Sequence, residues 1–419
     1  MWLHMALRSL ASRRTSVLLT LFTLAMSTAL LLGVEHIRQQ GKAGFFNTVS
    51  GTDLIVGARS GPVQLLLYSV FHIGSPTSNI RWQSYADLRE DSRVAWTIPL
   101  SLGDSHRGYR VIGTDNSMFA HYRYGDGFGL QLAAGQQLND LFAVVLGAEV
   151  ARALDYQVGD DIIIAHGTGN TSFMLHDNMP FRVSGILRAT GTPLDRALLV
   201  SMEGLEAVHL GWRAGIPLPG MQATAEQARK RNLTPRQLTA ALVGLNSRMQ
   251  AFHVQREINS KRQDPLSAVM PGVALQELWQ VVRMAEKALL AVSFAALLIG
   301  LGGMLAVLLS GMQQRRHEIA VLRALGARPL RIAGLLLLES LLLTLTGFVL
   351  GVLVLWGGLQ LLQQPLLEQF GLRLSVSGLL SGTQWLLAAA IVGLGAASGL
   401  VPAFMAYRMA LTKSLGQRY

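Results

Sequence analysis

Long apolar runs divide this chain of 419 residues. They cover residues 17–34, 288–312, 332–362 and 385–407, and only the third contains a charged residue, Glu339. A helix needs roughly 20 apolar residues to cross the hydrocarbon layer of a bilayer. The pattern therefore predicts four transmembrane helices, and the third is long enough to tilt or to extend beyond the bilayer.

The segment between the first two runs, residues 35–287, has a different pattern. Short alternating or β-branched runs bounded by glycine and aspartate predict strands, and periodic apolar positions predict helices. The predicted strands are 52–57, 109–113, 160–165, 181–187 and 196–201. The predicted helices are 145–154, 222–231 and 235–250, with a loop rich in glycine and proline at 211–221.

The order of these elements suggests how the segment is organised. The chain must leave and re-enter the membrane at neighbouring points, so we expect both ends of the segment to form one subdomain. A second subdomain, at about 120–205, would be inserted in its middle. Residues 35–47 and 274–287 would continue the neighbouring membrane helices as a stalk.

Charge places these segments relative to the membrane. The net charge is +11, and residues 1–16, 313–331 and 408–419 together carry +10 of it. Basic residues beside membrane helices mark the cytoplasmic side. We therefore expect a cytoplasmic N-terminus, loop and tail, with residues 35–287 and a loop at 363–384 on the other side of the membrane. The predicted fold is an α-helical membrane protein with four transmembrane helices, and with a large mixed α+β extracytoplasmic domain inserted between helices 1 and 2.

Two alternatives account for parts of this pattern. The first apolar run follows Arg13 and Arg14, as in a secretory signal peptide, but no small-residue cleavage site follows it and Glu35 comes directly after it. A pI near 10.4 is also typical of proteins that bind nucleic acid. Because the excess charge lies beside apolar runs, the expected partner is the lipid bilayer and not nucleic acid.

The sequence contains no motif of a catalytic or nucleotide-binding site. Its only Gly-Lys pair is followed by Ala43, whereas a P-loop requires serine or threonine there. The zinc-protease and nucleophile-elbow motifs are also absent. We therefore predict no enzyme, with no catalytic, cofactor-binding or metal-binding residues in this chain. The absence of cysteine excludes disulfides and thiol chemistry.

The loop between the second and third apolar runs contains an ordered motif, RRHEIAVLRALGAR, at residues 315–328. On a helix, Ile319, Leu322 and Leu325 would lie on one side, and Gly326 is placed to end it. A basic loop that only sets topology needs charge in no special order. The apolar stripe, the fixed charges and the glycine stop together favour a docking helix.

These residues resemble the signature of the MacB/FtsX-type permeases of ABC transporters, which include LolC/LolE-like members. The matching positions are Arg315, Arg316, Glu318, Ile319, Leu322, Arg323, Ala324, Leu325, Gly326, Ala327, Glu339 and Ser340. The tail is similar to the family ending at Pro402, Ala403, Ala406, Tyr407 and Arg408. The stretches DLIVGARSG and GYRVIGTD resemble the family's extracytoplasmic domains more loosely.

The resemblance implies a dimeric permease, formed with an identical or a different second copy, that is driven by a cytoplasmic ABC ATPase dimer. That partner would bind the ATP, and a periplasmic or lipoprotein partner is also expected. MacB itself has a fused ATPase domain, whereas only 16 residues precede the first apolar run here, so the chain resembles the split-subunit members. The loop would dock on the ATPase, with Glu318 and Arg323 at the contact. The expected ATPase-coupling residues are Arg315, Arg316, Glu318, Ile319, Leu322, Arg323, Leu325 and Gly326.

The predicted function is mechanotransmission. ATP hydrolysis in the partner would move the periplasmic domains, for export or extraction of an envelope substrate. An alternative is an FtsX-like regulatory scaffold that controls an extracytoplasmic enzyme such as a cell-wall hydrolase. A third is a membrane receptor or structural protein without an ATPase.

A few polar and small residues remain to be explained. Glu339 is an intramembrane functional candidate, either at a dimer interface or as a neutral carboxyl hydrogen-bonded to a nearby helix. Two Gly-x-x-x-Gly pairs, at 347/351 and 395/399, favour close packing of helices within the chain.

Eight histidines lie in the external segment: His36, His72, His106, His121, His166, His176, His209 and His253. A metal site needs its ligands to converge. The nearest two, His166 and His176, are ten residues apart, with Asp177 beside the second. Ordinary surface or hydrogen-bonded histidines are the expectation.

Overall fold

The structure is a computed structural model that describes residues 6, 10–11, 13–167, 176–213, 216–217, 223–261, 264–314, 329–370 and 382–415. The chain divides into two compact units. One unit consists of Met1–Gly41 and Val282–Tyr419, and the other of Lys42–Val281. Each unit has a hydrophobic core of its own.

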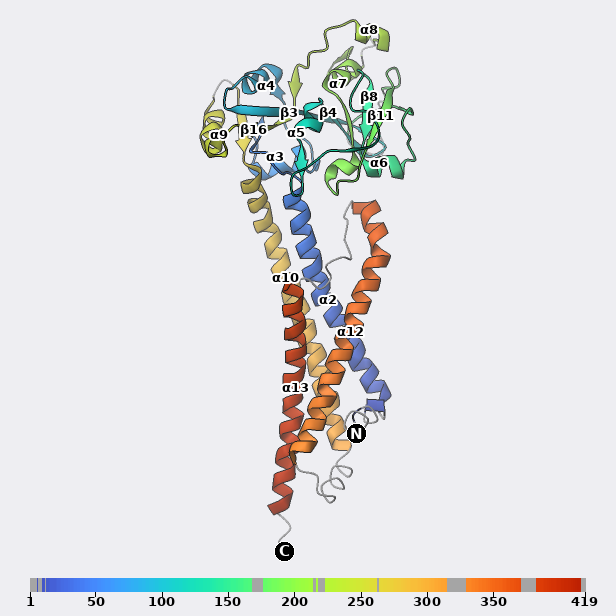
Figure 1. Ribbon diagram of the computed structural model, residues 1–419, viewed down its shortest axis with the longest axis vertical. Coiled ribbons are helices and arrows are strands. Elements are labelled where there is room, and N and C mark those ends of the chain that lie inside the picture. Colours follow the sequence, from blue (N-terminus) through green and yellow to red (C-terminus); the bar gives the residue numbers. More distant parts are fainter. Residues whose placement is uncertain are drawn as a thin grey trace. The chain divides into compact units, whose positions relative to one another are not determined.

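The first unit is built from long helices (Figure 1). The described helices are α2 (Arg14–Asn47), α10 (Pro271–Gln314), α12 (Pro329–Phe370) and α13 (Gly382–Leu415). Four stretches of them are long and apolar enough to cross a membrane: Arg14–Gly41, Pro271–Gln313, Leu330–Gln363 and Gly382–Arg408. This agrees with the four predicted transmembrane helices. Residues 35–47 and 274–287, predicted as a stalk, are helical and belong to α2 and α10.

The core of this helical unit is apolar, and so is much of its outer surface. Leu18, Leu19 and Phe22 on α2 are each more than 60% exposed. Exposed large apolar side chains in such numbers are typical of a surface that contacts lipid. The core residues come from all four helices and are Leu24, Leu31, Leu297, Leu301, Met304, Leu308, Leu343 and Ile391.

Both glycine pairs lie where two helices of this chain approach closely. A Cβ atom added to Gly351 would come 2.7 Å from the Cβ of Thr28 on α2. One added to Gly395 or Gly399 of α13 would collide with Thr344 or Ser340 of α12, respectively. The small residues therefore permit the packing of α2 and α13 against α12 within one chain.

The second unit contains a mixed sheet, which has 11 strands in the described residues. Strands β12 and β4 are parallel, as are β11 and β8, and the other neighbours are antiparallel. In spatial order the strands are β17 (Leu266–Val269), β1 (Leu54–Ala58), β16 (Ala240–Leu245), β3 (Val94–His106), β4 (Tyr109–Thr114), β12 (Ala197–Ser201), β8 (Ala143–Leu146), β11 (Phe181–Leu187) and β7 (Leu132–Gly135). In addition, β10 (Ala165–His166) pairs with β3, and β9 (Asp161–Ile162) pairs with β11.

Short ribbons and helices complete this unit. The two-stranded ribbons are β2 (Ile80–Arg81) with β15 (Gln237–Leu238), β5 (Arg123–Tyr124) with β6 (Phe128–Gly129), and β13 (Trp212–Arg213) with β14 (Ile216–Pro217). The short helices are α3 (Pro62–Ser69), α4 (Trp82–Arg89), α5 (Ser117–His121), α6 (Ala148–Ala153), η1 (Pro193–Arg196), α7 (Met202–Val208), α8 (Ala225–Arg229), η2 (Arg248–Gln250) and α9 (Ala251–Ser260).

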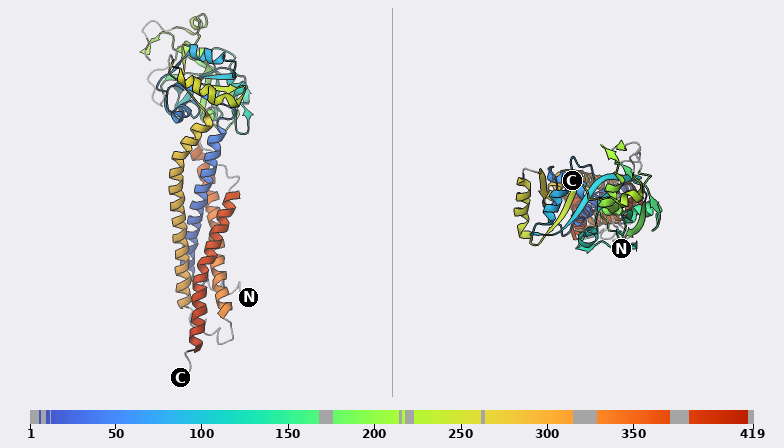
Figure 2. Two further views of the ribbon diagram at one scale, coloured as in Figure 1. Left: turned by 90° about the vertical axis from the view of Figure 1, so that its left-hand side faces the viewer. Right: turned by 90° about the horizontal axis from the view of Figure 1, so that it is seen from above.

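Alternation along the strands places apolar side chains on both faces of the sheet. Ile112 and Leu199 belong to a core that includes residues of α3 and α5. Their neighbours Val111 and Leu198 belong to another core, which includes residues of α6 and α7. Helices therefore cover both faces (Figures 1 and 2), as expected for a sheet that is apolar on both sides.

One long strand joins the two ends of this sheet. Residues 94–100 of β3 pair with β16, whereas residues 101–106 pair with β4. The stretch at about 120–205, predicted as an inserted subdomain, supplies strands β7 to β12 of the same sheet.

One predicted helix is wrong. The sequence pattern predicts a helix at 235–250, but these residues form β15, β16 and η2. Strand β16 lies between β1 and β3, and all six of its residues are buried. A strand buried on both faces shows a continuous apolar run, which periodicity alone cannot distinguish from a buried helix.

Candidate functional site

The eight expected coupling residues lie outside the described residues. Helix α10 ends at Gln314 and α12 begins at Pro329, so these two helices bracket the loop. The docking role of the loop stays a prediction. Its members are Arg315, Arg316, Glu318, Ile319, Leu322, Arg323, Leu325 and Gly326.

Glu339 lies on α12 and is buried within the helical unit, with 2% of its surface exposed. The next residue, Ser340, is fully buried, and its hydroxyl donates to the Leu337 carbonyl oxygen over 2.9 Å. This burial leaves little of the Glu339 side chain for a second subunit to contact. It favours a contact inside the chain over one at a dimer interface, and the functional role of Glu339 stays a prediction.

Polar side chains connect other helices of this unit. Ser27 on α2 donates to the carbonyl oxygen of Ala296 on α10 over 2.9 Å. Arg13, next to the start of α2, donates to the carbonyl oxygen of Val307 on α10 over 3.2 Å. His36 of α2 and Gln384 of α13 are hydrogen-bonded at 3.3 Å. Such bonds satisfy polar groups that have no water in a bilayer and hold α2 against its neighbours.

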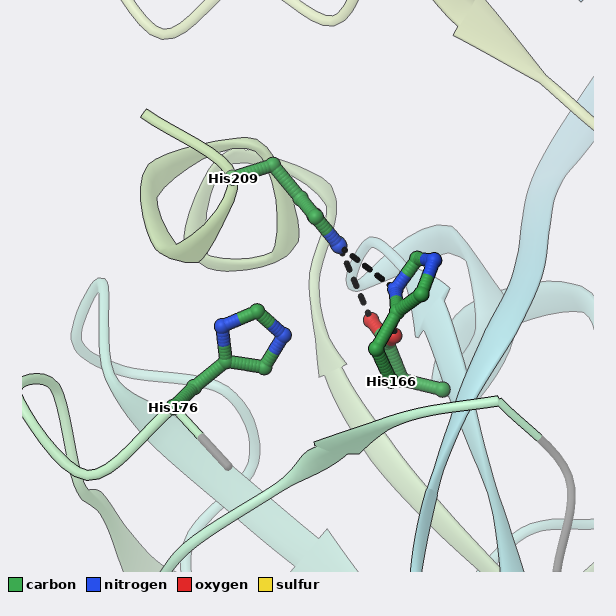
Figure 3. A group of neighbouring side chains, drawn as sticks. His166, His176 and His209 are labelled. Atoms are coloured by element: carbon green, nitrogen blue, oxygen red, sulfur yellow. Dashed lines mark hydrogen bonds and ion pairs between the residues drawn. The ribbon is translucent and has the colours of Figure 1, made fainter. Parts of the chain in front are cut away.

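A second candidate site lies in the sheet unit, where the side chains of Asp104, His166, His176 and His209 converge (Figure 3). Asp104 lies on β3, and His166 lies opposite it on β10. Residues directly opposite in an antiparallel pair have neighbouring side chains on the same face. His209 immediately follows α7, and the backbone N–H of His176 donates to the Ile164 carbonyl oxygen over 3.0 Å.

Distances within this His/Asp cluster are short. His166 Nδ1 lies 3.0 Å from Asp104 Oδ1 and 3.3 Å from His209 Nε2. His209 Nε2 lies 3.7 Å from Asp104 Oδ2. One potential ligand atom of each of the four side chains lies within 4.8 Å of the others. Figure 3 shows the three imidazole rings turned toward one another.

Burial differs between the members of the cluster. Asp104 and His176 are almost completely inaccessible to solvent, whereas the side chains of His166 and His209 are 38% and 29% exposed. The cluster therefore has a buried floor and a side that solvent reaches. A carboxylate buried as deeply as Asp104 is costly unless it is paired or ligated to a cation.

The tautomer of His209 is set by the backbone. Its Nδ1 lies 2.8 Å from the Leu205 carbonyl oxygen, and because a carbonyl oxygen can only accept, Nδ1 carries the proton. In the neutral ring, Nε2 then presents a lone pair toward Asp104 and His166. A backbone carbonyl that fixes one ring nitrogen in this way is typical of histidines whose other nitrogen binds a metal.

The cluster shifts the pKa values of its members. Burial would raise the pKa of Asp104, but the hydrogen bond with His166 and the nearby His209 ring outweigh it and hold that pKa well below its usual range. Burial lowers the pKa of His176 to about 4. Burial also opposes the charge on His209, but the neighbouring Asp104 carboxylate outweighs it and raises the pKa of His209. The site therefore contains a carboxylate and, at neutral pH, a neutral His176 ring.

Sequence reasoning found no signal for this convergence. It favours ordinary histidines, and His106 fits that expectation, because its ring nitrogens bond the Ile163 carbonyl oxygen at 2.7 Å and the Tyr156 hydroxyl at 3.0 Å. The sequence separations within the cluster are large, 62 residues between Asp104 and His166 and 43 between His166 and His209. No local ligand motif links them, and the sequence gives no reason to single out Asp104.

Known proteins resemble this chain over most of its length. A family model for the MacB-like periplasmic core domain matches residues 17–260, and one for the FtsX-like permease C-terminal region matches residues 290–415. No curated protein matches the chain.

Two solved structures are similar to part of this chain. The periplasmic region of MacB from Actinobacillus actinomycetemcomitans is 13% identical, with a TM-score of 0.34, over 55% of this chain and 94% of that one. The extracellular domain of the noncanonic ABC-type transporter YknZ from Gram-positive bacteria is 11% identical, with a TM-score of 0.30, over 52% of this chain and 98% of that one. At these scores neither structure adds to what the two family models show.

Proposed function

We propose a coupling function for this chain, which belongs to the family of MacB/FtsX-type ABC transporter permeases. In this proposal ATP hydrolysis by a separate cytoplasmic ABC ATPase moves the Lys42–Val281 unit, for export or extraction of an envelope substrate. The observation that carries the proposal is the FtsX-like match over 290–415. It covers α12, α13 and the basic loop that precedes α12.

The proposed orientation rests on charge. Residues 1–16, 313–331 and 408–419 hold nearly all of the excess positive charge, and each lies beside a candidate span. The positive-inside tendency then places both termini and the loop in the cytoplasm. The Lys42–Val281 unit lies on the other side of the inner membrane, in keeping with its match to a periplasmic core domain.

The proposed contact with the ATPase is the 313–331 loop. Its apolar positions 319, 322 and 325 would face the partner, and Glu318 and Arg323 would make charged contacts beside them. Charged groups at an interface fix the partner and the register more than they add affinity. The order of charges in this loop therefore matters, and not only their sum.

Helix continuity supplies a route for transmission. Helices α2 and α10 each contain residues of both units. A packed helix moves as a rigid element, so displacement of one part is passed to the rest. The apolar core of the helical unit favours transmission of movement over a wide aqueous channel through the chain.

The match to an FtsX-like model also supports a second purpose for the same movement. The sheet unit would then switch an extracytoplasmic enzyme instead of acting on a transported substrate. Deletion of the gene distinguishes the transport function from the regulatory function. Loss of a regulator gives division or envelope-shape defects without loss of export.

The coupling proposal is tested by charge reversal in the loop. Glu318→Arg adds positive charge and so preserves the topology signal. We expect it to reduce co-purification of a P-loop ATPase, and the ATPase activity of the solubilised complex, by about tenfold or more. Arg323→Glu should have the same effect.

The matched control is Arg14→Glu, which makes the same charge change as Arg323→Glu but at an exposed position at the start of α2, outside the loop. We expect this variant to retain the ATPase. If ATPase association and activity survive both Glu318→Arg and Arg323→Glu, the loop is a topology signal and the coupling proposal is wrong.

A further inference from the structure

The His/Asp cluster has no part in the proposed coupling. All four members lie in the Lys42–Val281 unit, and three of their side chains are imidazoles, which bind transition metals readily. We propose that Asp104, His166, His176 and His209 bind one zinc ion through three imidazole nitrogens and one carboxylate oxygen.

The spacing of the potential ligand atoms supports this site. A tetrahedral zinc ion with bonds of about 2.0–2.1 Å has its ligand atoms about 3.3 Å apart. His166 Nδ1 lies 3.0 Å from Asp104 Oδ1 and 3.3 Å from His209 Nε2, and His209 Nε2 lies 3.7 Å from the other carboxylate oxygen, Asp104 Oδ2. One ligand atom of each of the four side chains lies within 4.8 Å of the others, so a displacement of about 1.5 Å brings even the most distant pair to the tetrahedral spacing.

The donor set selects the kind of cation. Mg²⁺ and Ca²⁺ prefer oxygen ligands, whereas imidazole suits zinc, copper and nickel. Cu²⁺ and Ni²⁺ favour square-planar or tetragonal arrangements, whereas zinc is bound tetrahedrally by histidine nitrogens and carboxylate oxygens. A set of three imidazole nitrogens and one carboxylate oxygen therefore fits zinc.

Hydrogen bonding around the cluster orients its ligand atoms for a cation. The Leu205 carbonyl oxygen holds the His209 Nδ1 proton and directs Nε2 toward Asp104. Among the described residues, no group lies within hydrogen-bonding distance of Asp104 Oδ2. A zinc ion would replace the proton that His166 Nδ1 shares with its neighbours, and it would compensate the buried Asp104 charge.

Four protein ligands fill the coordination of zinc and leave no position for a substrate or a reactive water. Such closed sites are structural or regulatory, whereas catalytic sites keep one position open. Bound zinc would fasten β3 and β10 to the residue after α7 and to the segment that begins at His176. The partly exposed His166 and His209 give the ion access from solvent.

The test uses the whole chain, purified in detergent on a tag without histidine and stripped of metal by a chelator. Zn²⁺ is titrated in competition with a chromophoric indicator, and Co²⁺ is added separately to record its visible spectrum. We expect one Zn²⁺ per chain and the intense absorption of tetrahedral Co²⁺. Removal of one ligand should weaken zinc binding by at least the roughly 10–100-fold found for second-shell changes.

The ligand variants are His176→Ala and Asp104→Asn, the latter chosen because it keeps the shape of the side chain. The matched control is His253→Ala, an exposed histidine on α9, which should leave both stoichiometry and affinity unchanged. Circular dichroism of each metal-free variant shows whether it folds.

Two results would overturn the site. One is that wild-type protein binds no more zinc per chain than the His176→Ala variant does. The other is that bound Co²⁺ gives the weak absorption spectrum of octahedral coordination. If a ligand variant fails to fold, the wild-type stoichiometry and Co²⁺ spectrum still decide. Because ATPase association is not measured, failure here leaves the coupling proposal standing, and the converse also holds.

Discussion

At the scale of single residues, the buried carboxylates of the sheet unit differ in what surrounds them. Glu149 is paired with Arg196 at 2.5 Å, and Asp195 accepts from the backbone N–H groups of Thr190 and Gly191 at 2.7 and 2.8 Å. These arrangements satisfy a carboxylate permanently. Asp104 is surrounded by imidazoles instead, and imidazoles can exchange a proton for a metal ion. Glu149 and Asp195 therefore have the surroundings of structural carboxylates, whereas Asp104 has those of a metal ligand.

A charged cluster beside the start of β3 gives a prediction for acid stability. Arg93 contacts Asp91 at 2.5 Å and Glu257 of α9 at 2.8 Å. The hydrogen bond from Arg93 lowers the pKa of Asp91 from 3.8 to about 2. The unfolded chain therefore binds this proton first, so the contribution to stability is complete above about pH 4 and is lost as the pH falls through 2.

We expect Arg93→Met to lower the free energy of unfolding by about 1 kcal/mol at pH 6, a small value because the cluster is partly solvated. The cost should shrink between pH 4 and pH 2. Thermal unfolding of the purified chain at pH 6, 4 and 3 checks this, with Arg152→Met at an exposed position on α6 as the control. An equal cost for Arg93→Met at all three pH values would show that the ion pairs are not responsible.

The His/Asp cluster marks the limit of sequence reasoning at this scale. Residue types can be read from the chain, but the pairing of Asp104 with His166 depends on the register of β3 and β10. A shift by one residue would turn His166 to the other face. Register is decided by burial across the whole sheet. A contact between residues 62 positions apart therefore leaves no local pattern in the sequence.

At the scale of elements, glycine controls how closely the membrane helices pack. Gly395→Ala and Gly399→Ala each place a methyl group against Thr344 or Ser340 of α12. Alanine favours a helix by about 1 kcal/mol over glycine, but overpacking costs about 1–3 kcal/mol. We expect a net loss of stability, measured as a lower unfolding temperature in detergent.

The matched control for this prediction is Gly393→Ala on the same helix. No atom lies within 4 Å of a Cβ added there, so only the helix propensity changes. This variant should be as stable as the wild type or slightly more stable. If Gly395→Ala and Gly399→Ala behave like Gly393→Ala, the close approach of α12 and α13 does not limit stability.

The elements differ in how far the sequence predicts them. The membrane helices are predicted because each needs only a long apolar run, a property of the local sequence. Strands β4 and β11 are predicted because alternation or β-branched residues mark them. Strand β16 is not, because a Thr-Pro pair before it is typical of a helix start. Its central place in the sheet, which local patterns do not show, decides its conformation.

At the scale of the whole molecule, the uneven distribution of charge determines the proposed topology. Residues 35–287 carry a net charge of only +2 over 253 positions, whereas the three short segments carry +10. Short loops rich in arginine are retained in the cytoplasm, whereas long domains are translocated with little regard to charge. This difference favours a sheet unit outside the inner membrane, with both termini inside.

The natural chain has no cysteine, so each introduced thiol reports on one position. We choose two single variants, Ser78→Cys and Ser414→Cys. Ser78 is an exposed residue of the sheet unit, and Ser414 is near the end of α13. In intact cells a membrane-impermeant maleimide should label Ser78→Cys fully and Ser414→Cys only after the inner membrane is permeabilised. The two variants make the same substitution, so intrinsic thiol chemistry is matched.

Labelling of Ser414→Cys in intact cells would place the tail outside the membrane. Because two candidate spans separate the tail from the basic loop, the loop would then also lie outside, where it could not contact a cytoplasmic ATPase. A cytoplasmic tail and loop are necessary for coupling but are not sufficient for it. If the labelling confirms this topology, the Glu318 and Arg323 variants are still needed to test the docking contact.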